Sequence, residues 1–299
     1  MTMPTLRIHP DGPIISRIIQ GCGSILRKGV DTPERMADYV RACLDTGIMT
    51  FDLAAVYAGG QAEAVFGEAL SRQPALRSEM TLISKYGIEG FGDGYHCYDT
   101  SYEAIMRSAE NSLKRLHTDR IDLFLMHRPD MLMDADEVAR ALEELHRDGK
   151  ILHIGVSNFL PSQFELLASR LSLPIVVNEV PYSIINMDCA ENGTLDLCQQ
   201  KRVTPLFYSP LARGRIMHAP ENEQDMRIRK VLETIADECS ATVDQIALAF
   251  VLRHPSRGAA ILGGARVEWL RSAAKAANIT LSRDQWFRIW TASKGHEIP

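Results

Sequence analysis

The stretch TPERMADYVRACLDTGIMTFD, residues Thr32–Asp52, joins a helix pattern directly to a strand pattern. Thr32 is a favoured N-cap residue and Pro33 suits the first helical position, and apolar residues then recur every three or four positions until Gly47. Residues Ile48–Asp52 form a short apolar run that ends on a carboxylate, which is typical of a strand buried on both faces. The stretch therefore predicts an amphipathic helix that leads into a buried strand.

The same alternation recurs along the chain. A second clear helix pattern covers Asp134–Asp148, with Asp134 as its N-cap. The eight candidate strands are Arg17–Gln20, Ile48–Asp52, Thr81–Ser84, Ile121–Met126, Leu152–Val156, Ile175–Val177, Thr204–Phe207 and Ala259–Leu262. Because parallel strands need crossover connections and eight of them close a barrel, we expect an α/β fold of the (β/α)8 TIM-barrel type.

Two segments lie outside this repeat. Residues Leu6–Ile15 alternate apolar and polar side chains around Pro10-Asp11-Gly12-Pro13, which predicts a β-hairpin that plugs the N-terminal mouth of the barrel. Residues Ser282–Lys294 predict a C-terminal helix. No linker or internal repeat divides the chain, so we expect one domain over residues 1–299.

Composition narrows the class of protein. The chain has 299 residues, 45% of them hydrophobic and 24% charged, which is enough apolar mass for a sizeable core. A formal net charge of −5, without any run of Lys or Arg, argues against nucleic-acid binding. The six cysteines are scattered without a C-x-x-C pair, so reduced thiols are expected and neither disulfides nor a metal site. Because no segment resembles a signal peptide or approaches the ~20 apolar residues of a membrane span, we expect a cytoplasmic protein.

Four polar residues fall at or just beyond the second, third and fourth candidate strands: Asp52, Tyr57, Lys85 and His127. A Tyr hydroxyl is a poor acid at neutral pH unless a cation beside it stabilises the phenolate. Lys85 can be that cation, Asp52 can hold it in place, and His127 can hydrogen-bond a substrate oxygen. Each residue alone has an ordinary structural explanation, but barrel enzymes keep their chemistry on this rim. The pattern predicts a site for proton transfer to a carbonyl.

Two connections after strands are longer than the others. They cover Tyr86–Thr100, which is rich in glycine and includes Phe91 and Gly92, and Ser209–Gln224. In a barrel the loops after the strands build the active face, so both are candidates for substrate walls or cofactor lids. The alternative, that they are plain surface loops, stays open.

The residues from Gly47 to Tyr57 resemble the signature of the aldo-keto reductases. The resemblance covers almost the whole chain, and is closest to bacterial oxidoreductases of the family. Four further motifs follow in the family's order: Ile83-Ser-Lys85, Leu123-Phe-Leu-Met-His127-Arg-Pro129, Gly155-Val-Ser-Asn-Phe159 and Tyr208-Ser-Pro-Leu-Ala-Arg-Gly214.

This resemblance implies an NADP(H)-dependent reductase of aldehydes or ketones. Tyr57 would be the proton donor, Lys85 and Asp52 would tune it, and His127 would orient the carbonyl. Ser157 and Asn158 would hold the nicotinamide carboxamide and Tyr208 would stack on the ring. The implied cofactor residues are Ser157, Asn158, Glu179, Tyr208, Ser209, Leu211, Arg213, Gly214, Gly263, Arg266 and Arg271. The last two arginines match positions where the family grips the adenosine 2′-phosphate, which implies a preference for NADPH.

The chain departs from the family pattern at three positions. Leu53 follows Asp52 where Thr is usual, Ala58 follows Tyr57 where Gly is common, and Glu179 stands where Gln commonly contacts the carboxamide. The third departure matters most, because an ionised Glu only accepts hydrogen bonds whereas Gln also donates them.

Two other interpretations stay open. Some relatives bind NADP(H) mainly to regulate a channel or complex, so a cofactor sensor with little turnover is the alternative to an enzyme, although the intact catalytic set favours the enzyme. Gly21-Cys-Gly23 resembles the start of a Rossmann dinucleotide motif, but Leu26 occupies the third glycine position. A monomer is the family default, and the sequence does not identify the carbonyl substrate.

Overall fold

The expected barrel is confirmed by a computed structural model that describes residues 3–10, 12–90 and 94–298. Eight parallel strands close on themselves in the order β10-β11-β12-β3-β4-β5-β8-β9. Their bounds are Ile18–Gly21 (β3), Thr50–Asp52 (β4), Thr81–Tyr86 (β5), Ile121–Met126 (β8), Ile151–Ser157 (β9), Ile175–Pro181 (β10), Thr204–Tyr208 (β11) and Ala259–Leu262 (β12). All eight predicted runs therefore form strands: β5, β9, β10 and β11 are longer than predicted, β8 and β12 agree at both ends, β3 is shifted by one residue and β4 is two residues shorter.

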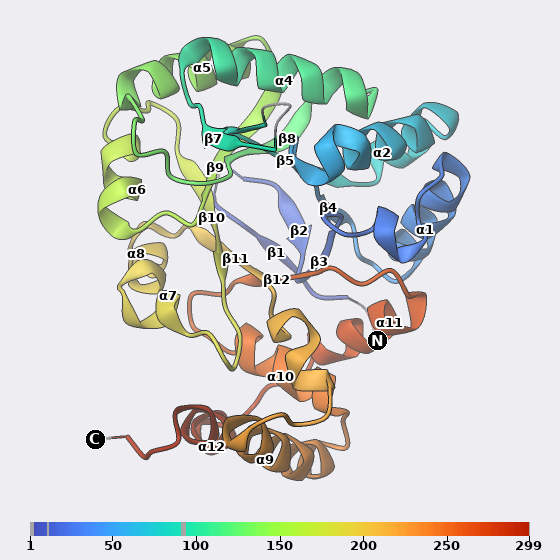
Figure 1. Ribbon diagram of the computed structural model, residues 1–299, viewed down its shortest axis with the longest axis vertical. Coiled ribbons are helices and arrows are strands. Elements are labelled where there is room, and N and C mark those ends of the chain that lie inside the picture. The colour runs from blue at the N-terminus through green and yellow to red at the C-terminus, as the bar shows by residue number, and fades with distance from the viewer. Residues whose placement is uncertain (1–2, 11, 91–93, 299) are drawn as a thin grey trace.

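Helices surround the barrel (Figure 1). They are Pro33–Asp45 (α1), Gln61–Arg72 (α2), Ala75–Ser78 (α3), Tyr102–Leu116 (α4), Ala135–Arg147 (α5), Pro161–Ala168 (α6), Asp188–Glu191 (α7), Thr194–Lys201 (α8), Glu223–Cys239 (α9), Val243–Leu252 (α10), Val267–Ala276 (α11) and Arg283–Lys294 (α12). The side chains of Thr32, Asp134 and Ser282 accept hydrogen bonds from backbone N–H groups in the first turns of α1, α5 and α12. The expected helix starts are confirmed. None of the described helices is long and apolar enough to cross a membrane.

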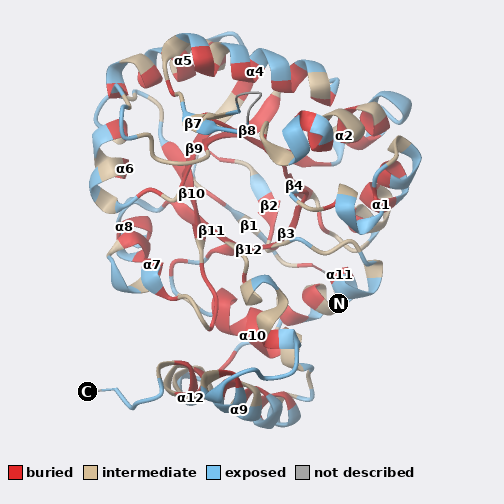
Figure 2. Cartoon of the chain, viewed as in Figure 1, coloured by how far each residue is buried: buried red, intermediate tan, exposed pale blue. Residues whose placement is uncertain are grey.

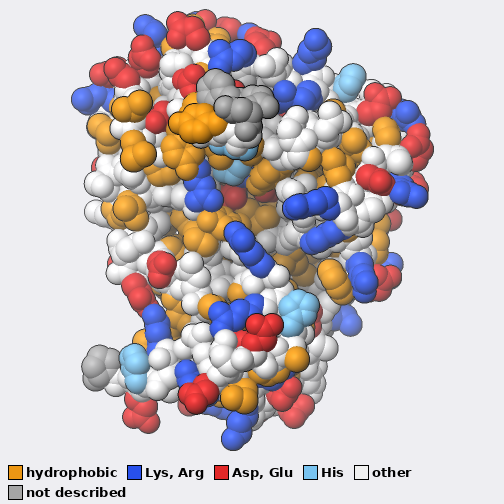
Figure 3. Space-filling view, viewed as in Figure 1, with side chains coloured by type: hydrophobic (Ala, Val, Ile, Leu, Met, Phe, Trp, Pro, Cys, Tyr) orange, Lys and Arg blue, Asp and Glu red, His pale blue; other side chains and the backbone are white. Residues whose placement is uncertain are grey.

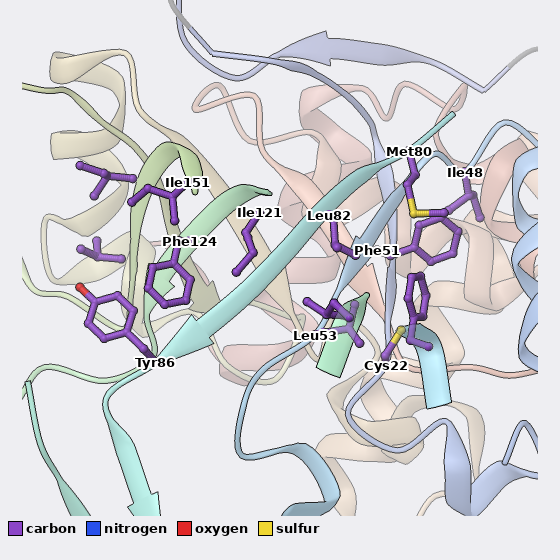
Figure 4. Packing of buried hydrophobic residues seen from close by; sticks show 14 of the residues in the cluster. Cys22, Ile48, Phe51, Leu53, Met80, Leu82, Tyr86, Ile121, Phe124 and Ile151 are labelled. Carbon is purple, nitrogen blue, oxygen red and sulfur yellow. The ribbon is translucent and has the colours of Figure 1, made fainter. Parts of the chain in front are cut away.

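The core has an inner and an outer layer. Aliphatic side chains fill the barrel interior: Ile19, Ile83, Leu123, Leu125, Val177, Leu206 and Ile261. The opposite faces of the strands pack against the helices, where Figure 4 shows Tyr86 beside Phe124 and Phe51 near Leu53. In Figure 2 the barrel strands are coloured mostly as buried, and the helices around them carry both buried and exposed residues. Because each barrel strand is packed on both faces, its C-terminal end is held in a fixed position.

The predicted N-terminal hairpin is present. Strands β1 (Thr5–Arg7) and β2 (Ile14–Ser16) pair antiparallel. Ile8 and Ile15 are buried within the inner barrel cluster, and Thr204 donates a hydrogen bond of 2.7 Å to the carbonyl of Ile8. The hairpin therefore plugs the barrel as expected, although Asp11 of its turn lies outside the described residues.

The two long connections contain more regular structure than the sequence indicated. Strands β6 (Ile88–Gly90) and β7 (His96–Tyr98) form an antiparallel hairpin within the first one. Phe91 and Gly92 fall outside the described residues. In the second, Ala212–Met217 forms a 3-10 helix (η3). Beyond it, α9 packs against α12 outside the ring of barrel helices (Figure 1).

Candidate active site

Adjacent strands bring Asp52, Lys85 and His127 together. Asp52 is the last residue of β4, Lys85 is the next-to-last residue of β5, and His127 directly follows β8. The pairing registers place Asp52 beside Ile83 and Lys85 beside Leu125. Since the three strands are neighbours in the barrel, their ends lie on the same rim.

Lys85 is the centre of the cluster and is almost completely buried. Its Nζ donates hydrogen bonds to Oδ1 of Asp52, to the carbonyl of Leu53 at 3.1 Å and to the hydroxyl of Tyr57 at 3.2 Å. The ammonium group thus has three oxygen acceptors, the number it can satisfy. The structure brings Asp52, Tyr57 and Lys85 into the contact that the sequence predicted.

The turn after Tyr57 directs its ring toward Lys85. Ala58, Gly59 and Gly60 all have positive φ values, of 50°, 62° and 89°. A left-handed conformation is unfavourable for a residue with a Cβ atom, which explains why glycine suits position 58. Ala58 therefore adopts a strained left-handed conformation, which glycine would adopt at a lower cost.

Burial dominates the titration of these groups. It raises the pKa of Tyr57 above its usual value, and the charge of Lys85 opposes that shift. Burial alone would lower the pKa of Lys85, but the negative charge of Asp52, with smaller effects of Glu179 and Tyr57, raises it well above the usual value. Lys85 is therefore a permanent cation beside a neutral phenol.

His127 packs against the ring of Tyr57. The two rings are 5.7 Å apart between centroids and meet edge to face at 81°. Burial, together with the positive charges of Lys85 and Arg128, lowers the pKa of His127 to about 3. The imidazole is thus neutral at physiological pH, so it can act as a hydrogen-bonding group but is a poor reservoir of protons.

Glu179 of β10 joins the cluster from across the barrel. One of its carboxylate oxygens, Oε2, lies 3.4 Å from Nζ of Lys85. Burial and the nearby charge of Asp52 raise the pKa of Glu179 to about 8, while Lys85 opposes the shift. The sequence placed Glu179 only at a nicotinamide site, so its pairing with Lys85 is new.

A second polar group lies at the ends of β9, β10 and β11. The hydroxyl of Tyr208 donates to Oδ1 of Asn158 at 2.9 Å, and Nδ2 of Asn158 donates to Oγ of Ser157 at 2.8 Å. Asn158 has a φ of 63°, and its N–H donates to the carbonyl of Glu179 at 2.7 Å. The structure thus brings together the four residues predicted for the nicotinamide end of a cofactor.

The residues predicted for the phosphate end lie in the connections after β11 and β12. Ser209, Arg213 and Gly214 all have positive φ values, while Leu211 packs against the hydrophobic core. The connection after β12 contains the exposed residues Gly263 and Arg266, and α11 contains the exposed Arg271. In the described part of the chain no carboxylate forms an ion pair with Arg213, Arg266 or Arg271.

Comparison with known proteins agrees with this geometry. The model of the Aldo/keto reductase family matches residues 17–294. The chain belongs to the aldo-keto reductase family. It is 40% identical to the oxidoreductase YdhF of Escherichia coli K12, over 98% of this chain and 99% of that protein. It is 36% identical to a 6-dehydroglucose reductase of Agrobacterium fabrum, over 95% of this chain and 96% of that one.

Solved structures of other aldo-keto reductases share the fold. The thermostable aldo-keto reductase Tm1743, solved with the inhibitor epalrestat, superposes with a TM-score of 0.82 at 31% identity, over 97% of this chain and all of the other. Family membership and the names of these relatives support an oxidoreductase.

Sequence reasoning overlooked two residues of this aldo-keto reductase rim. A Cβ atom on Gly23 would lie 3.3 Å from Cζ of Tyr57, so glycine allows the ring to pack there. Lys28 donates a hydrogen bond to the carbonyl of Gly263 and adds a positive charge beside the connection after β12. Gly23 had been considered only as part of a Rossmann-like motif, and the position of Lys28 depends on barrel closure.

The face that carries the strand ends is basic near its centre. Figure 3 shows Lys and Arg side chains there, with acidic side chains more frequent toward the edge of the view. A locally positive surface on a chain with a formal net charge of −5 favours an anionic ligand at this rim. Among the described residues no group of three or more His, Cys, Asp or Glu could hold a metal ion.

Proposed function

We propose that this aldo-keto reductase reduces aldehydes or ketones to alcohols with NADPH, and that Tyr57 donates the proton to the carbonyl oxygen. One observation carries the proposal. The Tyr57 hydroxyl lies 3.2 Å from the ammonium group of Lys85, which is itself fixed by Asp52. A phenol next to a fixed cation is suited to release a proton to a developing alkoxide.

Each residue of the cluster has a separate task. Asp52 holds Lys85 in its charged form and orients it. Lys85 stabilises the negative charge that forms on Tyr57 as the proton leaves. His127, which is neutral and packs against the Tyr57 ring, provides a hydrogen bond for the carbonyl oxygen. These roles involve proton transfer and orientation.

The other side of the rim fits a dinucleotide with phosphate groups. Aldo-keto reductases generally use NADPH or NADH, and the bound reduced nicotinamide supplies the hydride. Ser157, Asn158, Glu179 and Tyr208 would hold the nicotinamide end. Ser209, Leu211, Arg213, Gly214 and Gly263 would line the pyrophosphate, and Arg266 with Arg271 would bind the 2′-phosphate. The fit rests on the polar cluster around Asn158 and on arginines that form no ion pair with a carboxylate in the described residues.

The test is NADPH oxidation with a panel of aldehydes, α-dicarbonyls, ketones and an oxidised sugar, in the wild type and in Tyr57→Phe. We expect the variant to bind NADPH almost normally and to lose carbonyl reduction by a factor of about 100 to 10,000, the range for one proton-transfer group. Full activity of Tyr57→Phe would reject Tyr57 as the donor. Tight NADPH binding by a wild type that reduces no member of the panel would favour the sensor function instead.

A further inference from the structure

Glu179 has an unusual environment for a buried carboxyl group. The residue is 3% exposed, and its Oε2 atom accepts no hydrogen bond within the described part of the chain. The same atom lies 3.4 Å from Nζ of Lys85, within ion-pair distance. Buried polar atoms almost always have hydrogen-bond partners, so this oxygen requires an explanation.

The charges around Glu179 do not balance if Glu179 and Asp52 are both ionised. Lys85 faces two carboxyl groups, and Asp52 already receives a direct hydrogen bond from its ammonium group. In the described part of the chain, the other charged or titratable groups that interact with Lys85, Asp52 or Glu179 are Tyr57, His127, Cys22 and Arg128. On the two neighbouring strands the residues in register with Glu179 are Ser157 of β9 and Leu206 of β11, which are uncharged. One buried cation thus serves two buried acids.

When two buried acids share one cation, ionising both of them has a high free-energy cost. Asp52 has the direct hydrogen bond, so the second negative charge is the more costly one and belongs to Glu179. The raised pKa of Glu179, about 8, agrees with this geometry. Its main causes are burial and the charge of Asp52, and both favour the neutral carboxyl group.

We propose that Glu179 carries a proton in the active enzyme and is a positioning residue for Tyr57, because neutral Glu179 leaves the charge of Lys85 available to the phenol. Loss of that proton to solvent places a second carboxylate on Lys85 and makes the Tyr57 hydroxyl a weaker proton donor. Carbonyl reduction therefore declines as Glu179 ionises. This inference rests on the proposed function and adds a pH control to the same site.

His127, Tyr57 and Lys85 do not titrate in the same pH range as Glu179, and burial also raises the pKa of Asp52 while Lys85 opposes that shift. The pKa of His127 is about 3, while those of Tyr57 and Lys85 are raised above their already high usual values. Among these residues of the cluster, Glu179 alone is expected to change charge close to pH 8. A decline of the rate in that range that is absent from Glu179→Gln would therefore identify Glu179.

The first test is the pH dependence of kcat for carbonyl reduction at saturating NADPH, in the wild type and in Glu179→Gln. Between about pH 7 and about pH 9 we expect the wild-type rate to fall roughly tenfold, and the Gln variant, which mimics the neutral acid, to lose this decline. Glu63→Gln is the matched control, because Glu63 is equally buried but hydrogen-bonds Ser84, Ser112 and Arg115. It should keep the wild-type decline. An unchanged decline in Glu179→Gln would overturn the proposal.

The second test needs no turnover. An ordinary Glu in the unfolded chain releases its proton near pH 4.5, whereas folded Glu179 keeps it to about pH 8. The stabilisation that this proton gives is complete below the lower value and is lost as the pH rises to the upper one. The melting temperature of the wild type minus that of Glu179→Gln should therefore fall across this interval. A constant difference in melting temperature would refute a protonated Glu179, even if the wild type proves inactive. Inactivity of the wild type would by itself contradict only the proposed function.

Discussion

Two groups of charged side chains share the rim of this aldo-keto reductase, and they are held in opposite ways. Asp52, Lys85 and Glu179 are at most 3% exposed, and the two carboxyl groups each lie within ion-pair distance of Lys85. Arg266 and Arg271 are exposed, and in the described part of the chain neither has a carboxylate ion-pair partner. Arg266 instead lies over the ring of Trp269, with its Cζ atom 5.0 Å from the ring centroid.

The difference follows from the cost of removing charge from water. A charge inside the barrel must have a fixed partner before any ligand arrives, because the unpaired charge would destabilise the fold. An exposed arginine stays hydrated at little cost and can exchange that water for a phosphate group. On the proposed function, the buried group would therefore contribute to both folding and chemistry, whereas the exposed arginines would contribute to binding alone.

The largest expected effect is that of removing the buried cation. Lys85→Met would leave Asp52 and Glu179 without their common partner, so we expect a loss of at least about 100-fold in kcat and of about 3–5 kcal/mol in the free energy of unfolding. The measurements are steady-state carbonyl reduction and urea unfolding. Lys201→Met, which removes an exposed ion pair with Glu165, should cost less than about 1 kcal/mol. Equal stability losses in the two variants would remove the contrast between buried and exposed charge.

The second prediction concerns the exposed group. Arg271→Ala should weaken NADPH binding by about 10- to 100-fold, as expected for one charge-assisted phosphate contact, and should leave NADH binding and the unfolding free energy nearly unchanged. Fluorescence titration with both cofactors measures the effect. Lys275→Ala, on the same helix, is the control for a general change in charge. A parallel loss of NADH affinity would exclude Arg271 as a 2′-phosphate ligand.

The smallest effect tests how tightly the Tyr57 ring is positioned. A Cβ atom at position 23 would meet Cζ, Cε2 and Cε1 of Tyr57 at 3.3, 3.4 and 3.5 Å, so the ring must shift by a few tenths of an ångström. We expect Gly23→Ala to lower kcat by about tenfold, since small displacements of a reacting group are costly. The dissociation constant of the variant for NADPH should stay the same. A normal kcat would show that the reaction tolerates a small displacement of the Tyr57 ring.

The sequence was sufficient for the barrel because buried parallel strands carry a strong local signal. The runs Ile121–Met126 and Ala259–Leu262 agree with β8 and β12 at both ends. The β6–β7 hairpin was missed because its strands have three residues each, too few for a period of two to be distinguished from a loop.

The site was only partly predictable for a different reason. Asp52, Tyr57, Lys85 and His127 could be placed because each lies at or just beyond the end of a strand on one side of the barrel. The contact between Lys85 and Glu179 joins strands that are not neighbours in the barrel, and no local pattern reports such a distance. The raised pKa of Glu179 and the lowered pKa of His127 likewise arise from burial, which only the closed barrel creates.

The hairpin that plugs the barrel also constrains the order of events during biosynthesis. The carbonyl of Ile8 is bound by Thr204, which is synthesised 196 residues later. Strand β3 is likewise synthesised long before β12, one of the two strands with which it pairs in the barrel. At typical synthesis rates of roughly 5–20 residues per second, these segments remain without their partners for on the order of ten seconds or more. The nascent chain must keep the apolar residues of the hairpin and of β3 from aggregating until Thr204 and β12 have been made.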